Sequence, residues 1–212
     1  MIKLLQDELY EDESRKQLDE LKVFLDAKKE YGEKEIHDFF KARPQLILLM
    51  GKVLQVKNPS RYNDELPVIG KYRADFAITD AKAEFYAFVE FENAEKSSIF
   101  HVNENSKTDT YFWAARFEHG YSQVIDWYLH LARNNDTKNM KSEFGSQEIE
   151  YYGALIIGRD YNLDAGDNRD RFLWRVKNSL IDSHPVYCNT FDGLLDDMET
   201  EFMTTKMPST RP

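Results

Sequence analysis

The sequence predicts a mixed α/β fold in which one sheet is covered by helices on both faces. Residues 74–78 and 85–92 alternate like the two strands of a hairpin and are rich in aromatic and β-branched residues. Residues 151–157 form a nearly continuous apolar run, which is typical of a buried central strand. Residues 121–131 and 169–181 repeat apolar positions at helical spacing. The order is therefore helix, two or three strands, then helix, strand, helix and strand.

Composition predicts one globular domain. The chain has 212 residues, 42% of them hydrophobic, and no Pro-, Gly- or Ser-rich linker divides it. We expect a helical extension at residues 1–30, a main domain at 31–200 and a flexible tail at 201–212. Cys188 is the single cysteine, and the sequence contains no signal-peptide pattern and no apolar run that could span a bilayer. These features predict a cytoplasmic protein without a membrane partner.

The net charge limits the function classes. A formal charge of −10 argues against a protein that mainly coats nucleic acid, because such binding depends on Lys and Arg neutralising phosphates. It does not exclude a DNA enzyme, since sites that hold divalent metals are themselves acidic.

The first elements are predicted to be helical. Residues 1–30 place Leu18, Leu21 and Leu25 on one stripe, and Ser14 with Gln17 has the spacing of a capping box for the second of two helices. Residues 33–40 form a further helix that ends before Pro44. A short apolar stretch, residues 46–50, follows, and residues 52–67 are expected to be irregular, with an edge strand at 53–56.

The later elements follow the hairpin. Residues 93–118 are expected to form a loop that runs into a helix, and Gly120 precedes a core-facing helix at 121–131 with Gln123 at its start. After the central strand and the helix at 169–181, residues 186–190 read as a final strand that leads into a terminal helix. Residues 204–212 are expected to fray.

The hairpin carries the most informative residues. Alternation places Glu90 and Glu92 on one face of the second strand, and a turn centred on residues 82 and 83 puts Asp75 opposite Glu90. Like charges facing each other at roughly 5 Å are destabilising, so a divalent cation, a raised carboxyl pKa or a basic neighbour is needed to offset them. The same register puts Arg73 opposite Glu92, and the alternative is therefore an ordinary cross-strand salt bridge.

Other common sites are absent from the sequence. There is no Gly-rich phosphate loop, no dinucleotide-binding turn and no Gly-x-Ser-x-Gly elbow. The five histidines form no pair at zinc-ligand spacing, which favours surface or structural roles for them. The remaining candidates are Glu33, Asp75, Glu90, Glu92 and Gln123, in the order helix, strand, strand, strand and helix.

This order resembles the PD-(D/E)XK nuclease superfamily, which has a restriction-endonuclease-like core. More narrowly, about residues 30–198 are similar to the nuclease domain of the Shedu anti-phage defence proteins. The similarity is carried by Gly32-Glu33, Phe39-Phe40, Pro44-Gln45-Leu46-Ile47, Ala74-Asp75-Phe76-Ala77-Ile78, Phe88-Val89-Glu90-Phe91-Glu92, Ser122-Gln123-Val124-Ile125-Asp126-Trp127, Tyr152-Gly153-Ala154-Leu155-Ile156-Ile157 and Thr190-Phe191-Asp192-Gly193-Leu194-Leu195. Each motif alone is weak, and their order gives the resemblance its specificity.

The resemblance implies a metal site. Asp75, Glu90 and the backbone carbonyl of Phe91 would bind Mg²⁺ or Mn²⁺, and Glu33 would bind through water. Gln123 would position the site or the DNA strand. Glu92 takes the position that usually holds Lys, where it could be a further ligand or a general base.

With Glu92 in place of the usual Lys, the source of the positive charge that faces the phosphate is open. The nearest candidates in the sequence are Lys71, Arg73 and Lys96. The implied function is metal-dependent DNA endonuclease or nickase activity in anti-phage defence, by a homo-oligomer with DNA as substrate. The alternative is a nuclease-fold protein that no longer cleaves and serves as a binding or regulatory module. A third possibility is a structural interaction protein that uses the helices of residues 1–30.

Overall fold

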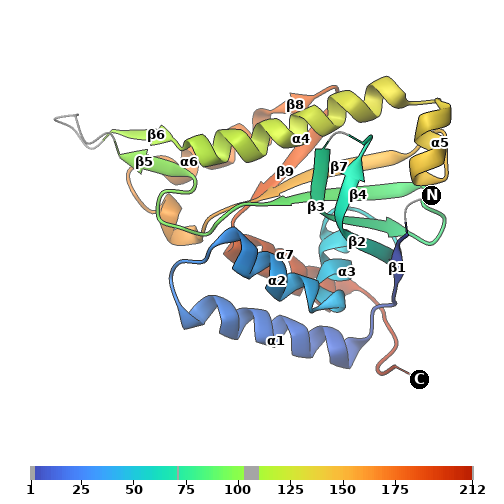
Figure 1. The fold of residues 1–212 in the computed structure, drawn as a ribbon. Helices are drawn as coiled ribbons and strands as arrows, with labels where there is room; N and C mark the ends of the chain where they lie inside the picture. Colours follow the sequence, from blue (N-terminus) through green and yellow to red (C-terminus); the bar gives the residue numbers. More distant parts are fainter. Residues whose placement is uncertain (1–2, 71, 103–109, 212) are drawn as a thin grey trace.

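A mixed seven-stranded sheet forms the centre of the protein (Figure 1). The computed structural model describes residues 3–70, 72–102 and 110–211. The strand order is β1-β2-β3-β4-β7-β9-β8, with antiparallel pairing from β1 to β4, parallel pairing of β4 with β7 and of β7 with β9, and antiparallel pairing of β8 with β9. The strands are β1 (Leu5–Gln6), β2 (Pro59–Val68), β3 (Tyr72–Asp80), β4 (Phe85–Phe91), β7 (Glu150–Ile156), β8 (Leu180–Ile181) and β9 (His184–Asn189). The predicted mixed α/β class is confirmed.

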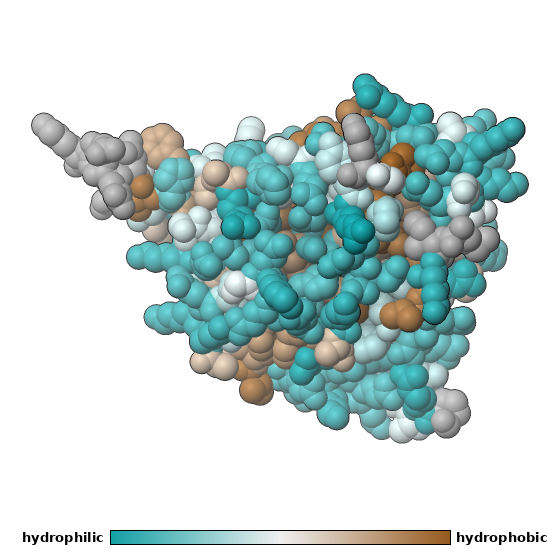
Figure 2. Space-filling view, viewed as in Figure 1, coloured by the Kyte–Doolittle hydropathy of each residue, from teal (hydrophilic) through white to brown (hydrophobic). Residues whose placement is uncertain are grey.

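Helices cover both faces of this sheet, as predicted (Figure 1). One face packs against α1 (Glu11–Ala27), α2 (Glu33–Lys41), α3 (Pro44–Val53) and α7 (Phe191–Thr204). The other packs against α4 (Ala115–Asn134), α5 (Lys138–Phe144) and α6 (Asn168–Asn178). The short helix η1 (Asp160–Leu163) follows β7, and β5 (Phe100–Val102) pairs with β6 (Tyr111–Trp113) in a separate two-stranded sheet. Hydrophilic residues cover most of the face seen in Figure 2.

Strand β4 separates the two cores by simple alternation. Ala87, Val89 and Phe91 pack in the core beneath α1, α2, α3 and α7, whereas Tyr86 and Phe88 pack in the core beneath α4 and α5. Because side chains alternate along a strand, Glu90 and Glu92 project toward α4. The predicted hairpin and its register are confirmed, since residues 76–79 of β3 pair with residues 86–89 of β4 in that register.

The prediction of two helices in residues 1–30 is wrong. The segment holds β1 and a single helix, and Ser14 lies inside that helix, where its buried hydroxyl donates to Oε1 of Gln45 at 3.0 Å. Gln17 caps a different helix, because its Oε1 accepts the backbone N–H groups of Gln45 and Leu46 at 2.9 and 3.3 Å. The capping residue thus serves the start of α3, which the local sequence does not show.

The prediction of an irregular segment at residues 52–67 holds only for residues 54–58, and the edge strand predicted at 53–56 does not form. The short apolar stretch belongs to α3, which runs to Val53 with Pro44 in its first turn, where a proline is favourable. Residues 59–68 form the ten-residue strand β2. Pro59 stands at the first position of that strand, and β1 covers β2 only at Arg61 and Tyr62, so the prolines do not interrupt a fully paired central strand.

Two boundaries in the second half of the chain differ from prediction. Helix α4 begins at Ala115 and not after Gly120, so Gln123 lies in its interior, and the short helix α5 was not predicted. The central strand β7 and the final strand β9 followed by α7 agree with the predicted elements, and α6 agrees up to Asn178, after which residues 180–181 form β8 instead of continuing the helix.

The carboxy-terminal segment lies against α1. The carbonyl groups of Pro208 and Ser209 accept the backbone N–H groups of Glu11 and Asp12, and Arg211 contacts Asp7 at 2.9 Å. These bonds differ from the fraying that we expected. Among the described residues, no helix is both long enough and apolar enough to cross a membrane.

Candidate active site

Asp75 and Glu90 lie on adjacent strands at one end of the hairpin. The paired residues of β3 and β4 end at Phe76 and Val89, and continuing that register by one residue places Asp75 opposite Glu90. Oδ2 of Asp75 accepts the backbone N–H of Phe91 at 2.6 Å. The structure therefore places Asp75, Glu90 and Phe91 side by side, the three positions that the resemblance implies as direct metal ligands.

Glu90 is a buried carboxyl group with an unsatisfied oxygen. The residue is 8% exposed, and its Oε2 has no hydrogen-bond partner among the described residues. Burial raises the pKa of Glu90 to about 10, and the neighbouring carboxylates of Asp75, Glu92 and Glu33 raise it further, while the Gln123 amide opposes the shift. Glu90 is consequently protonated at neutral pH unless a cation binds beside it.

Asp75 is perturbed in the same direction but less strongly. Burial raises the pKa of Asp75 to about 6, and the Phe91 N–H and His37 oppose that shift. Glu33 and Glu92 contribute to the increase. The carboxylates of Glu33, in α2, and Glu92, directly after β4, thus lie near enough to Asp75 and Glu90 to raise the pKa of both.

Glu92 is enclosed by two side chains of α4. Its side chain is 3% exposed, Nη1 of Arg116 donates to its Oε2 at 3.0 Å, and Nδ1 of His119 lies 3.2 Å from its Oε1. Burial raises the pKa of Glu92, and the bonds from Arg116 and His119 oppose this shift. The cross-strand pair of Arg73 with Glu92 does not form, because Arg73 contacts Glu65 at 3.0 Å instead.

One face of α4 supplies the polar side chains that cover the carboxylates. Arg116, His119, Gly120 and Gln123 follow the i, i+3, i+4, i+7 spacing of a single helix face. Gly120 permits the close approach, since a Cβ atom there would lie 2.7 Å from Cδ1 of Leu155 and 3.0 Å from Cγ of Glu92. A larger residue at that position would push the helix away from the strand.

Glu33 and Gln123 reach the same region. Glu33 begins α2, and its Oε2 accepts from Nη1 of Arg116 at 3.2 Å, so Arg116 bridges Glu33 and Glu92. Nε2 of Gln123 donates to the backbone carbonyl of Arg73 at 3.2 Å. Both residues are thus placed beside the hairpin, as the order of motifs predicts.

The cationic candidates named from the sequence are not gathered there. Lys71 lies outside the described residues. The side chain of Arg73 is 65% exposed and paired with Glu65, and Lys96 is exposed, with its backbone N–H bonded to Glu30. No described contact joins either of these two side chains to Asp75, Glu90 or Glu92.

Sequence reasoning missed Arg116, His119 and His37. The His37 ring stacks on Phe76 with centroids 4.8 Å apart, and its Nε2 is buried without a partner among the described residues. The signal that could have found the α4 residues is their common helix face with Gln123. Placing the start of the helix after Gly120 removed the turn that holds Arg116 and His119.

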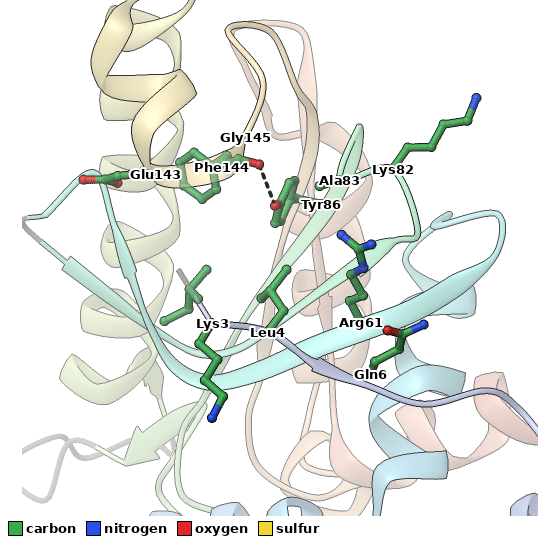
Figure 3. Close-up of a pocket in the computed structure, with 11 residues that line it drawn as sticks. Lys3, Leu4, Gln6, Arg61, Lys82, Ala83, Tyr86, Glu143, Phe144 and Gly145 are labelled. Atoms are coloured by element: carbon green, nitrogen blue, oxygen red, sulfur yellow. Dashed lines mark hydrogen bonds between the residues drawn. The ribbon is translucent and has the colours of Figure 1, made fainter. Parts of the chain in front are cut away.

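Two cavities lie over this side of the sheet. A cavity of about 380 Å³ adjoins the α4 residues and is lined by Tyr72, Ala115, Glu118, His119, Ser122, Gln123 and Asp126. A second, of about 420 Å³, lies at the other end of β4, where Tyr86 donates a hydrogen bond to the carbonyl of Phe144 (Figure 3). Its acidic lining residue is Glu143, and the amine of Lys82 points away from it in Figure 3. The first cavity is lined by His119, which contacts Glu92. It is therefore the cavity next to the candidate active site.

The match to known families agrees with this geometry. A family model described as "Shedu protein SduA, C-terminal" matches residues 30–195. The chain belongs to the Shedu family. The match spans Glu33, the hairpin and the part of α4 that covers Glu92, whereas α1 lies before it. No curated protein matches the chain.

The residues of the candidate site in this Shedu-family chain fit a magnesium-type ion in part. Among the described side chains, no three His, Cys, Asp or Glu residues form a ready metal-binding group. Mg²⁺ typically retains several waters and uses one or two carboxylates, so a complete protein cage is not required. The unsatisfied buried oxygen of Glu90 beside Asp75 is the feature that suits such an ion.

Proposed function

We propose that this protein cleaves DNA phosphodiester bonds with a divalent metal, as an endonuclease or nickase that acts in anti-phage defence. The observation that carries the proposal is the buried, unsatisfied Oε2 of Glu90 within a cluster of four carboxyl groups. Repulsion in that cluster is relieved by a cation. Membership of the Shedu family supports the same direction.

In this proposal, Asp75, Glu90 and the backbone carbonyl of Phe91 would hold Mg²⁺ or Mn²⁺, and Glu33 would bind through water. The bound ion supplies an acidic water and Lewis acidity at the phosphate. Glu92 accepts the proton of the attacking water, and the bonds from Arg116 and His119 keep its carboxylate oriented. Gln123 fixes the position of the strand carrying Asp75 through the Arg73 carbonyl.

One observation favours the second candidate, a nuclease-fold module that binds without cleaving. Both oxygens of Glu92 are engaged by α4 side chains, which leaves this carboxylate less available as a base. Such a module would bind the metal and DNA and leave the DNA intact.

The deciding experiment incubates the purified protein with supercoiled and linear DNA in Mg²⁺, in Mn²⁺ and in chelator. We expect metal-dependent nicking by the wild type and none by Glu90→Gln, which keeps the shape of the side chain and removes its ability to ionise when a cation binds. Glu84→Gln is the matched control, because Glu84 is exposed at the turn end of the same hairpin. Equal nicking by Glu90→Gln and wild type would exclude the assignment.

Metal-induced stabilisation measured together with nicking separates the two candidates, because both bind the metal and only the nuclease cleaves DNA. A ligand that binds only the folded state raises its melting temperature by mass action. A wild type that is stabilised by Mn²⁺ but leaves DNA intact supports the binding module. Sedimentation of the same samples tests the proposed homo-oligomer.

A further inference from the structure

Among the residues that the structure describes, Arg116 is the arginine or lysine that forms ion pairs with the carboxylate cluster. It stands in the first turn of α4, and its Nη1 lies 3.0 Å from Oε2 of Glu92 and 3.2 Å from Oε2 of Glu33. Glu92 occupies the position where the PD-(D/E)XK arrangement usually has a lysine. The guanidinium of Arg116, which comes from α4, therefore contacts the Glu92 carboxylate that stands in place of the usual lysine ammonium.

The Arg116 guanidinium keeps donors available for a further anion. Both of its described bonds use Nη1, and its Nε and Nη2 have no acceptor among the described residues. The side chain is 48% exposed, in contrast to the 3% of its partner Glu92. A guanidinium presents five N–H donors in a planar fork that suits phosphate oxygens. Nη1 can remain on Glu92 while the rest of the fork binds a phosphate.

A positive charge at the proposed site would offset the repulsion between DNA phosphates and the carboxylates. DNA phosphates approaching Glu33, Asp75, Glu90 and Glu92 meet a cluster of acids, and the ionic bonds of Arg116 are the ones in the described structure that reach two members of it. Arg116 also lies at the amino-terminal end of a long helix, where the helix dipole favours anions. Both effects draw a phosphate toward the same point.

We propose that Arg116 contacts the scissile phosphate and replaces, from α4, the positive charge of the missing lysine. This inference rests on the proposed nuclease function. Glu92 then has two roles, since it holds Nη1 in place and receives the proton of the attacking water. Arg116 is a catalytic residue in this scheme, because it touches the reacting phosphate.

The first test measures DNA binding in chelator, where cleavage does not interfere. The Kd for a short duplex is measured by fluorescence anisotropy as NaCl increases, for wild type, Arg116→Ala and Arg116→Lys. Loss of one phosphate contact reduces the slope of log K against log salt by about 1. We expect that reduction for Arg116→Ala and a near-wild-type slope for Arg116→Lys. The matched control is Arg169→Ala, because Arg169 is 46% exposed and also contacts two carboxylates, Asp160 and Asp164.

The second test measures plasmid nicking with Mg²⁺ or Mn²⁺. Arg116→Ala is expected to reduce kcat at least tenfold, and the double variant Glu92→Lys with Arg116→Ala is expected to recover much of that loss. The double variant removes the ion pair and puts a lysine at the usual place, where that side chain both steadies charge on the phosphate and orients the attacking water in place of Glu92. If Arg116 only supported Glu92, removing both would give no recovery. Melting temperatures confirm that each variant is folded.

The outcomes distinguish this inference from the proposed function. Arg116→Ala with the wild-type kcat and the wild-type salt slope overturns the inference and leaves the function in place. A reduced kcat with an unchanged slope and no recovery in the double variant also overturns it, in favour of a structural ion pair. A wild type that nicks no DNA under any metal condition overturns both.

Discussion

Replacing Glu90 with Gln changes how stability depends on pH. In the folded protein the pKa of Glu90 is about 10, chiefly because burial disfavours its charge, so the carboxyl group stays protonated at lower pH. In the unfolded chain the same carboxyl group ionises at its ordinary value of 4.5. Between these values the folded state holds one proton more than the unfolded state, so stability falls as pH rises. Gln cannot titrate, and the variant loses this dependence.

The size of the effect follows from the one-proton difference. Each pH unit inside that window changes the free energy of unfolding by about 1.4 kcal/mol. From pH 6.5 to 8.5 the metal-free wild type should therefore lose about 2.7 kcal/mol relative to Glu90→Gln. Asp75, with a pKa of about 6, completes most of its titration below this range. The range thus isolates Glu90.

The assay is urea denaturation in chelator at both pH values, for wild type, Glu90→Gln and Glu84→Gln. Taking the difference between variants cancels the titration of every shared group whose pKa is the same in both variants. The Glu84→Gln difference should stay constant, because that side chain is exposed. A Glu90→Gln difference that also stays constant within about 0.5 kcal/mol, the scale of an ordinary surface substitution, would mean that Glu90 is ionised in the folded protein and that its burial has been misjudged.

Two further substitutions test the packing around the site. Gly120→Ala should destabilise the protein by about 1–3 kcal/mol, because the added Cβ would lie 2.7 Å from Cδ1 of Leu155; a more stable variant in urea denaturation would contradict the close approach of α4. Asp192→Ala should cost about 3 kcal/mol in the same assay, since it leaves the Arg159 guanidinium, 9% exposed, without the carboxylate that it contacts at 2.8 Å. Asp164→Ala, which removes an exposed partner of Arg169, is the control and should change stability by less than about 1 kcal/mol. Equal effects of the two Asp substitutions would show that the buried pair is no stronger than a surface one.

The elements that were predicted correctly are those whose structure follows from residues close together in the sequence. The alternation of residues 85–92 and the position of the turn were sufficient to give the register of β3 and β4 and the common face of Glu90 and Glu92. The apolar run at β7 likewise indicated a buried strand, which the sheet order places between β4 and β9. In each case the side-chain period and the burial of the strand appear in the sequence itself.

Contacts between distant segments explain what was not predicted. Gln17 has the sequence signature of a local cap, but its side chain bonds to the start of α3. Pro59 and Pro67 suggest a loop, yet β2 tolerates them because β1 pairs with only two of its residues. Neither outcome can be read from neighbouring residues, since each depends on which element packs alongside.

The α4 face shows how one misplaced boundary hides a site. Glycine is a poor helix former, so Gly120 suggested a helix start, although it lies within α4 and allows the helix to approach Glu92. With that start, Gln123 is the first polar residue of the helix, and Arg116 and His119 fall in a loop. With the observed start at Ala115, the three residues share a face directed at the hairpin carboxylates. The glycine that interrupts the helical pattern is therefore the residue that permits the contact, and Arg116 reaches Glu92 from a position that only the tertiary structure reveals.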